Sequence, residues 1–428
     1  MVEMKDSEIK WIGNIPKHWE VHPVYSYFSE RKNKNRLGKE QNLLSLSYGN
    51  IIKKDINSNG GLLPESFNTY NIIEENDIII RPTDLQNDKR SLRTGLVKEH
   101  GIITSAYIDM KPKKEVNSHY FHYLLHSYDI QKVFYNMGNG VRQALNFSEF
   151  SKLMVFAPPL KEQNKIADFL DEKCAEIDSI STEIQEQVDT LEEYKKSVIT
   201  EAVTKGLNPN AEMKDSGIEW IGQIPNNWDM KRTKYVSISF SKGNGITKED
   251  VDSDGDIQCI RYGEIYSKYN IMFKNCISTT NLNKISSPKY IANGDILFAG
   301  TGELVEEIGK NIVYIGNKPC LAGGDIIILK HNQNPGFLNY VLCSQYAQIQ
   351  KSLGKAKLKV VHISAFDIGN VRIALPPIEE QKKIADYLDS KCLEIDSAIK
   401  DKQKQLKILD EYKKTLIYEY VTGKKEVA

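Results

Sequence analysis

An internal repeat dominates the sequence, and its two copies lie about 210 residues apart. The motif Trp-Ile-Gly-x-Ile-Pro-x-x-Trp occupies residues 11–19 and again residues 220–228. A second motif, Pro-Pro-Leu/Ile-x-Glu-Gln-x-x-Ile-Ala-Asp-Phe/Tyr-Leu-Asp, occupies residues 158–171 and 376–389. This period is far too long for one unit of a solenoid. The chain is therefore predicted to contain two similar domains, each followed by the same second element.

The second element, residues 158–205 and 376–428, is predicted to be a long helix. Each copy opens with two prolines, which suits a helix start, and no Gly or Pro interrupts the first copy before Gly206. Apolar residues recur in steps of three or four, as in a heptad seam. The predicted seam positions are Ile177, Ile180, Ile184, Val188, Leu191, Tyr194 and Val198 in the first copy, and Ile395, Ala398, Lys402, Leu406, Leu409, Tyr412 and Leu416 in the second.

Lys402 is the charged residue in this predicted seam. We expect it to extend its ammonium group to the edge of the seam, and the alternative is a role in setting the helix register. A single long helix cannot bury its own apolar stripe. The two helices are therefore expected to pair antiparallel within the chain.

The segments between the repeated motifs read as β-rich domains with some helix. Short runs bounded by Gly, Asn, Asp and Pro are strand-like at residues 77–80, 95–97, 295–298, 311–315 and 325–329. One helix per domain is expected, around residues 119–135 and 336–353. The fold class is thus α+β: two β-rich mixed α/β domains (1–157 and 206–375) separated by two long antiparallel coiled-coil helices (158–205 and 376–428), with a pseudo-two-fold internal repeat.

The charges are distributed unevenly, although the 57 basic and 57 acidic residues balance. Residues 1–160 and 206–375 each carry +3, residues 161–205 carry −6, and residues 376–428 are neutral. The two domains are therefore mildly basic, as suits nucleic-acid contact. The acidic first helix is a poor ligand for DNA and a better surface for protein partners.

Several functional classes are disfavoured by what the sequence lacks. It contains no apolar stretch of about 18 residues, so no membrane span is expected, and residues 1–11 do not read as a secretory signal. The six cysteines form no Cys-x-x-Cys pair, so a reducing cytoplasm is expected and a zinc site is not. No phosphate loop, dinucleotide fingerprint or catalytic constellation can be assembled. The chain reads as a recognition protein without a cofactor or metal of its own.

Arginine, lysine and amide side chains, which contact phosphates and base edges, gather at a few places in the two domains. Any one of them could be an ordinary solvated residue, and the two tyrosines among the candidates could equally belong to the core. As a set on two divergent copies of one fold, they favour DNA contact. The candidates are Tyr48, Asn50, Arg81, Lys89, Arg90, Arg93, Arg142, Gln143 and Asn146 in the first domain, and Lys242, Arg261, Tyr262, Lys355, Lys357 and Lys359 in the second.

These motifs together closely resemble the specificity (S) subunits of type I restriction-modification systems. The resemblance rests on the Trp-Ile-Gly openings, the Pro-Pro helix starts and the Glu-Tyr-Lys-Lys helix ends at residues 193–196 and 411–414, and it covers the whole chain. It implies that each domain is a target recognition domain that reads one half of a bipartite site in double-stranded DNA. It also implies that the paired helices act as a ruler for the gap between the half-sites.

The same resemblance implies partners and a non-catalytic role. Two modification (methyltransferase) subunits, which carry S-adenosylmethionine, would dock on the helices, for which Glu162, Gln163, Glu380 and Gln381 are the candidates at the helix starts. Restriction (translocase/endonuclease) subunits, which use ATP and Mg, would join them. Two alternatives stay open: a two-headed coiled-coil scaffold that binds proteins or glycans, and the specificity module of another bipartite-site system. An enzyme of unknown chemistry is a third, weaker reading.

Overall fold

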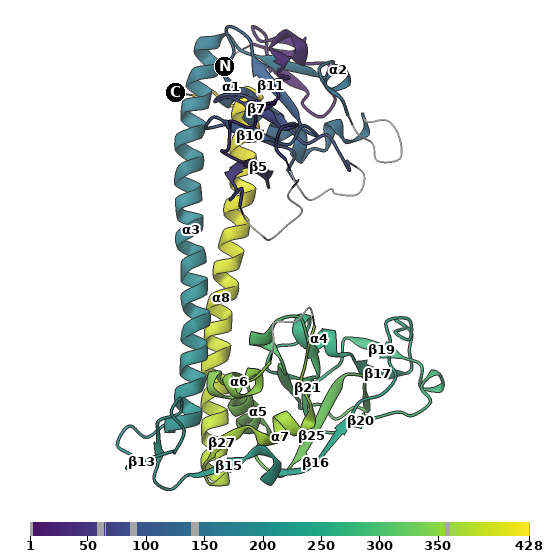
Figure 1. The fold of residues 1–428 in the computed structure, drawn as a ribbon, viewed down its shortest axis with the longest axis vertical. Coiled ribbons are helices and arrows are strands. Elements are labelled where there is room, and N and C mark those ends of the chain that lie inside the picture. The colour runs from purple at the N-terminus through teal and green to yellow at the C-terminus, as the bar shows by residue number, and fades with distance from the viewer. Residues whose placement is uncertain are drawn as a thin grey trace. The chain divides into compact units, whose positions relative to one another are not determined.

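The repeated halves fold as two compact units, and each unit includes part of both long helices. The computed structural model describes residues 3–57, 64, 66–85, 92–137, 145–355 and 360–427. Unit 1 comprises Met1–Gln185 with Lys404–Ala428, and unit 2 comprises Glu186–Gln403. Helices α3 (Leu160–Lys205, 46 residues) and α8 (Ile378–Val421, 44 residues) each run from one unit into the other (Figure 1). Unit 1 is therefore discontinuous in sequence, whereas unit 2 is continuous.

Helices α3 and α8 pair antiparallel, as expected, through ion pairs that the repeat duplicates. In unit 1, Lys413 Nζ of α8 lies 2.6 and 2.7 Å from the carboxylate oxygens of Asp178 in α3. In unit 2, Lys195 Nζ of α3 lies 2.6 and 2.8 Å from those of Asp396 in α8. The lysines occupy equivalent positions in the two copies, and so do the aspartates. The pairing is thus related by the internal pseudo-two-fold symmetry.

The seam between these helices follows a stricter heptad than the apolar pattern predicted. The predicted positions Ile177, Ile184 and Val188 are buried, but Ile180 and Tyr194 are exposed. In α3 the seam includes their neighbours Ser181 and Lys195, which are partly buried. In α8 the predicted seam residue Tyr412 is exposed, and Lys413 occupies the seam position instead. The apolar neighbours were misleading because polar residues hold these true seam positions. Lys402 is half-buried, which fits a lysine at the edge of the seam.

The repeated Trp-Ile-Gly motif builds a small framework in each unit. In unit 1 this framework consists of a hairpin, β1 (Met4–Asp6) and β2 (Asn14–Pro16), and a two-stranded sheet, β3 (Glu20–Pro23) and β12 (Met154–Ala157). In unit 2 it consists of the hairpin β13 (Met213–Asp215) and β14 (Gln223–Pro225) and the sheet β15 (Asp229–Arg232) and β27 (Arg372–Leu375). Trp19 and Trp228 are fully buried in these frameworks. Gly423 and Gly206, which follow α8 and α3 with φ of +67° and +73°, pass directly over these tryptophan rings. A side chain there would be strained and would crowd the ring.

The last turns of α8 complete the core of unit 1. Leu416, Ile417 and Val421 are buried in one cluster with residues from the N-terminal half of the chain. The hydroxyl of Tyr120 donates to the main-chain oxygen of Val421 at 3.2 Å. The core of unit 1 therefore depends on the C-terminal part of the chain.

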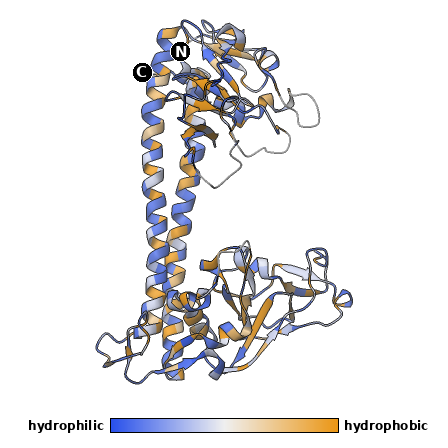
Figure 2. Cartoon of the chain, in the orientation of Figure 1, coloured by the Kyte–Doolittle hydropathy of each residue, from blue (hydrophilic) through white to orange (hydrophobic). Residues whose placement is uncertain are grey.

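The head of unit 1, which is the part between β3 and β12, is built around an antiparallel sheet in the order β4-β11-β8-β9. Its predicted strands at residues 77–80 and 95–97 correspond to β8 and β9. Figure 2 shows hydrophobic residues as orange ribbon within this head. The elements are β4 (Phe28–Glu30), β5 (Leu44–Ser47), β6 (Asn50–Lys53), β7 (Asn71–Ile73), β8 (Ile78–Ile80), β9 (Thr94–Leu96), β10 (Gly101–Ile103), β11 (Ile108–Pro112), α1 (Ser118–Ile130) and α2 (Phe147–Phe150). Strand β5 pairs with β6, and β7 pairs with β10.

The head of unit 2 has a five-stranded sheet in the order β16-β25-β21-β23-β18 and a four-stranded sheet in the order β19-β17-β24-β20. The helix expected over residues 336–353 is interrupted at Ser344, which has an extended backbone. The strands are β16 (Ser237–Lys242), β17 (Ile257–Ile260), β18 (Met272–Phe273), β19 (Ser278–Thr280), β20 (Tyr290–Ile291), β21 (Ile296–Ala299), β22 (Thr301–Gly302), β23 (Asn311–Tyr314), β24 (Cys320–Ala322), β25 (Ile326–His331) and β26 (Val361–His362); the helices are α4 (Tyr262–Ser267), α5 (Pro335–Cys343), α6 (Gln345–Ser352) and α7 (Ala365–Asn370).

Double-mutant cycles across the helix pair test the duplicated ion pairs. We expect a coupling energy of about 1 kcal/mol between Lys195 and Asp396, measured with Lys195→Met and Asp396→Asn in urea unfolding, because this lysine side chain is only 14% exposed. The Asp178–Lys413 pair, whose aspartate is 62% exposed, should couple by at most about 0.5 kcal/mol. The exposed Lys173–Glu176 pair within α3 is the control and should couple still less. Equal coupling in all three pairs would contradict a role in the seam.

Candidate nucleic-acid interface

A tight hairpin presents Tyr48 and Asn50 at the surface of unit 1. Strands β5 and β6 are joined by Tyr48 and Gly49 alone, and both have positive φ (+45° and +83°). Two-residue hairpin turns of this kind require such a backbone, and a side chain on Gly49 would press on Leu92 at 3.2 Å. The Tyr48 side chain is 75% exposed, so it does not belong to the core. An exposed tyrosine at a hairpin tip is free to contact a ligand.

Asn50 lines a polar depression of about 550 Å³ between the head of unit 1 and the helices. Its walls include Lys98, His119 and, from α3, Asp171. A hydrogen bond from His119 to Asp171 (2.7 Å) raises the pKa of that histidine, whereas burial lowers the pKa of the adjacent His122 to about 3. Asn50 therefore faces the helices as well as the hairpin surface.

Arg93 does not suit DNA contact, which corrects the prediction for this residue. Its side chain is fully buried and donates to the main-chain oxygens of Thr83 and Asp84 and to the hydroxyl of Tyr135. Its guanidinium group therefore holds the loop after β8 in place. Arg81, at the start of that loop, is partly buried, and its main-chain N–H donates to the oxygen of Arg93 at 2.8 Å.

Asn146 has a structural task as the N-cap of α2. Its side chain accepts from the main-chain N–H of Glu149, and the Glu149 carboxylate accepts from the N–H of Asn146. This reciprocal capping box satisfies two helix-end donors and accounts for an asparagine at this position. The candidates Lys89, Arg90, Arg142, Gln143, Lys357 and Lys359 lie outside the described residues.

Lys242 lies at the end of β16, beside a depression of about 380 Å³ in unit 2. Its ammonium group is 3.0 Å from Asp325, and its side chain is 67% exposed. Thr301 and His362 line the same depression and are hydrogen-bonded to each other at 3.1 Å. Sequence reasoning missed these two residues, because only the pairing of β22 with β26 brings them together. The group offers a cation, a hydroxyl and an imidazole on one surface.

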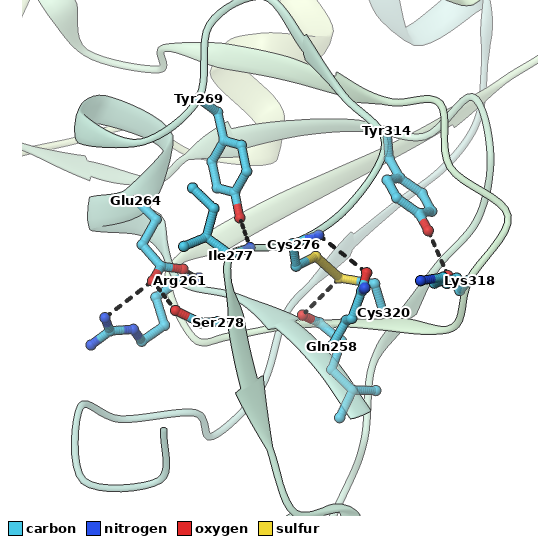
Figure 3. The surroundings of a disulfide bond; sticks show 11 residues. Gln258, Arg261, Glu264, Tyr269, Cys276, Ile277, Ser278, Tyr314, Lys318 and Cys320 are labelled. Atoms are coloured by element: carbon cyan, nitrogen blue, oxygen red, sulfur yellow. Dashed lines mark hydrogen bonds and ion pairs between the residues drawn. A yellow bond between two sulfur atoms is a disulfide. The ribbon is translucent and has the colours of Figure 1, made fainter. Parts of the chain in front are cut away.

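Arg261 and Tyr262 lie at the start of α4, within a network that surrounds a disulfide bond (Figure 3). The Arg261 guanidinium group donates to Glu264 at 3.2 Å, and Glu264 also accepts from Ser278. Tyr262 is 38% exposed, so its ring is only partly available. Arg261 is thus engaged within the protein, although a phosphate could compete for it.

A disulfide bond joins Cys276 and Cys320, a pairing that the expectation of a reducing cytoplasm did not include. Strand β17 pairs with β19 on one side and β24 on the other, so the residues just before β19 and at the start of β24 meet across it. Gln258 of β17 accepts from the main-chain N–H of Cys276 at 3.1 Å. The bond fixes the segment that leads into Ser278. The two cysteines meet because of the order of the strands in the sheet, and the sequence pattern did not predict that order.

Lys355 is engaged in unit 2 rather than projecting freely. Its ammonium group lies 2.9 Å from Asp367, and its side chain is 21% exposed. Of the three candidate lysines in this segment, Lys355 thus forms an internal ion pair, and the other two lie outside the described residues.

Gln163 and Gln381 are framework residues, which corrects their assignment as partner contacts. Both are buried, and each donates to the oxygen of the first proline of its Pro-Pro pair at 2.9 Å. Each also accepts from the main-chain N–H of an asparagine, Asn117 or Asn334, that caps the neighbouring helix. Each glutamine side chain thus donates to one main-chain oxygen and accepts from one main-chain N–H. These two hydrogen bonds connect the helix start to the head in both units.

The two neighbouring glutamates are closer to the surface. Glu162 accepts from His18 at 2.8 Å and from the indole N–H of Trp19 at 3.1 Å. Glu380 accepts from Asn227 at 3.3 Å. Both carboxylates thus tie the framework to the helix starts while remaining partly accessible. Among the described residues, no three His, Cys, Asp or Glu side chains gather as metal ligands, and none of the described helices could span a membrane.

The family model for the type I restriction modification DNA specificity domain matches residues 28–190 and 225–415, one match for each copy of the repeat. The chain belongs to this family. It is thus a type I restriction-modification specificity subunit, a non-catalytic component of such a system. The first match starts at β4 and the second at the end of β14, and both extend into a long helix.

Named relatives and a solved structure agree with this assignment. The specificity subunit is 25% identical over 363 residues to the type I restriction enzyme MjaVIII specificity subunit of Methanocaldococcus jannaschii, covering 82% of this chain and 80% of that protein. It is 26% identical over 319 residues to the putative MjaX specificity subunit of the same organism, covering 73% and 69%. A chain solved in a study of complex assembly and conformational transition of the type I R-M system aligns with a TM-score of 0.67 at 16% identity, covering 96% of this chain and 99% of that one. This likeness shows the fold.

Reduction of the Cys276–Cys320 bond should destabilise unit 2. Cross-links that close loops of this length typically stabilise a fold by about 2–4 kcal/mol, and this one spans 44 residues. Urea unfolding of the oxidised and the reduced protein should therefore give a lower midpoint after reduction. Cys276→Ser is the control, since its midpoint should match the reduced protein and should not respond to reductant. Identical midpoints for the oxidised and reduced protein would refute this contribution.

Proposed function

We propose that this specificity subunit recognises double-stranded DNA, with each unit reading one half of a bipartite site. One observation carries the proposal: the framework contacts are duplicated almost residue for residue, while the heads that they support differ. Gln163 and Gln381 make the same hydrogen bonds to their helix starts, yet the largest described sheet of one head has four strands, and the other head has sheets of five and four strands. Two different heads on one framework suit two different half-sites.

The exposed side chains on the heads supply suitable chemistry. Tyr48 and Asn50 in unit 1, and Lys242, Thr301 and His362 in unit 2, include donors and acceptors that contact base edges and phosphates. All of them lie on loops or strand ends, where sequence can vary without loss of the core. The heads can therefore change their target while the framework is retained.

We further propose that α3 and α8 set the gap between the half-sites and dock two modification subunits, which restriction subunits join. S-adenosylmethionine, ATP and Mg would then belong to these partners, and the complex would work in the cytoplasm. The acidic character of residues 161–205 supports protein rather than DNA contact along α3. The accessible Glu162 and Glu380 are candidate contacts at the helix starts.

Replacing Lys242 with Glu should weaken DNA binding by the assembled complex. Loss of one phosphate contact should reduce the slope of log affinity against log salt by about one, and the new charge should repel DNA further. Fluorescence anisotropy at several salt concentrations measures both effects. Lys242→Arg, which keeps the positive charge at the same position, is the matched control and should bind nearly as the parent does. If the parent's affinity did not depend on salt, DNA recognition would be refuted in favour of a protein or glycan scaffold.

Lengthening both helices by one heptad tests the ruler. Seven residues inserted between Gln185 and Glu186, and seven between Gln403 and Lys404, would keep the seam in register and add about 10 Å at 1.5 Å per residue. At about 3.4 Å per base pair, the gap should grow by about three base pairs while both half-sites stay the same. Methylome sequencing of cells that carry the modification subunit reads both quantities. An unchanged gap, or altered half-sites, would refute the ruler.

A further inference from the structure

The framework sheet of unit 2 carries two opposed arginines that unit 1 lacks. Arg232 of β15 lies directly opposite Arg372 of β27, whereas the equivalent pair in unit 1 is Pro23 opposite Met154. The Gln350 side chain binds the main-chain N–H and oxygen of Arg372, so this is a position of the ladder without direct cross-strand bonds. Side chains approach most closely at such positions, and like charges opposite each other are destabilising.

No acidic residue offsets this repulsion within the described part of the protein. Arg232 donates to the side-chain oxygen of Asn370 at 3.3 Å, and neither arginine forms an ion pair among the described residues. Of the nearby carboxylates, Asp229 pairs with Lys231 and Asp367 with Lys355, whereas the exposed Glu219 lines the second depression and forms an ion pair with neither arginine. Lys351 is buried and turned inward, where it donates to three oxygens. The two arginines therefore present uncompensated positive charge to an outside anion.

Large apolar side chains surround the arginine pair. Two depressions of about 420 and 550 Å³ meet at Arg372 and Ile218. Their rims carry Tyr235, Leu353 and Phe366, which are 71%, 70% and 77% exposed. Trp220 contributes to the second depression and is 46% exposed. Such a concentration of exposed apolar surface marks an interaction site.

The exposure of Trp220 is itself a departure from the repeat. Its counterpart in unit 1, Trp11, packs against Tyr128 at 4.7 Å and Tyr418 at 6.2 Å between ring centroids. The repeat places Gln345 and Thr200 at the positions of those two tyrosines, and these two residues are hydrogen-bonded to each other. Unit 2 therefore lacks the aromatic residues that would cover its tryptophan, at the same surface where it carries the arginine pair.

We infer that this surface, the arginine groove formed by Trp220, Arg232, Tyr235, Leu353, Phe366 and Arg372, docks an acidic segment of a protein partner that also carries an apolar side chain. Arginine, tryptophan, tyrosine and phenylalanine are the residues enriched at the centres of protein interfaces, whereas sheet-face contact with DNA needs no such apolar rim. Because the inference rests on the proposed function, the partner is a modification subunit of the same system.

The arginine groove makes the two docking positions unequal. Pro23 and Met154 at the equivalent place in unit 1 offer no charge to an acidic segment. Of two modification subunits, one is thus held by an additional contact that the other lacks. Assembly therefore proceeds through an intermediate with a single modification subunit, bound on the side of unit 2.

The test uses the full-length specificity subunit and its purified modification subunit in mass photometry over a range of concentrations. The double variant Arg232→Glu, Arg372→Glu should weaken the tighter of the two binding events about tenfold or more, so that both subunits bind alike. Phe366→Ala should weaken the same event several-fold, and its 77% exposed side chain can be removed without loss of the core. Met154→Glu, the equivalent exposed site in unit 1, is the control and should leave the tighter event unchanged.

DNA binding and methylation separate the remaining outcomes. If the groove variants assemble normally but lose DNA affinity, the groove serves DNA and the inference is overturned. If they change neither assembly nor DNA affinity, the inference is overturned while bipartite methylation by the parent still supports the proposed function. If the parent binds no modification subunit and supports no methylation, both the inference and the proposed function fall.

Discussion

The antiparallel contact between α3 and α8 is the constraint on which the rest of this structure depends. Each helix has a polar surface on most sides and one seam that must leave water, and neither can cover its own seam. Lys195–Asp396 and Asp178–Lys413 place a charged pair at equivalent points of that seam in the two units. Oppositely charged partners at fixed points favour one register over a slipped one. Within each unit the head is attached to a helix start through the buried Gln163 or Gln381.

The residues that are the same in both copies mainly build the framework and do not form the candidate binding surfaces. Gln163 and Gln381 sit in the most similar stretch of the repeat, and both satisfy buried main-chain groups. The tryptophans and the glycines above them are retained for packing. The surfaces suited to recognition occur where the copies disagree, as at Lys242 and the opposed Arg232 and Arg372. In a duplicated chain, divergence between the copies is the more informative signal of binding.

The architecture could be predicted from the sequence because it depends on repeated motifs and on the spacing of apolar residues. A repeat of this length, a helix start with two prolines and a three-four apolar step do not depend on tertiary context, and the fold class was confirmed. The site residues were less predictable, because exposure depends on packing. Arg93 looks like a loop cation but is enclosed by carbonyl oxygens, and Cys276 meets Cys320 only through the strand order. The seam was misplaced by one residue at Ser181, Lys195 and Lys413, where polar side chains occupy it.

The discontinuity of unit 1 has a consequence for how the chain folds as it is synthesised. Domains usually fold in the order in which they leave the ribosome, the N-terminal one first. Here the core of unit 1 contains Leu416, Ile417 and Val421, which are translated almost last, whereas unit 2 is complete once residue 403 has emerged. The nascent head of unit 1 must wait with its apolar face uncovered while the second half is made. We therefore expect the C-terminal half to complete its fold first. Until then the N-terminal half exposes apolar surface of the kind that chaperones bind.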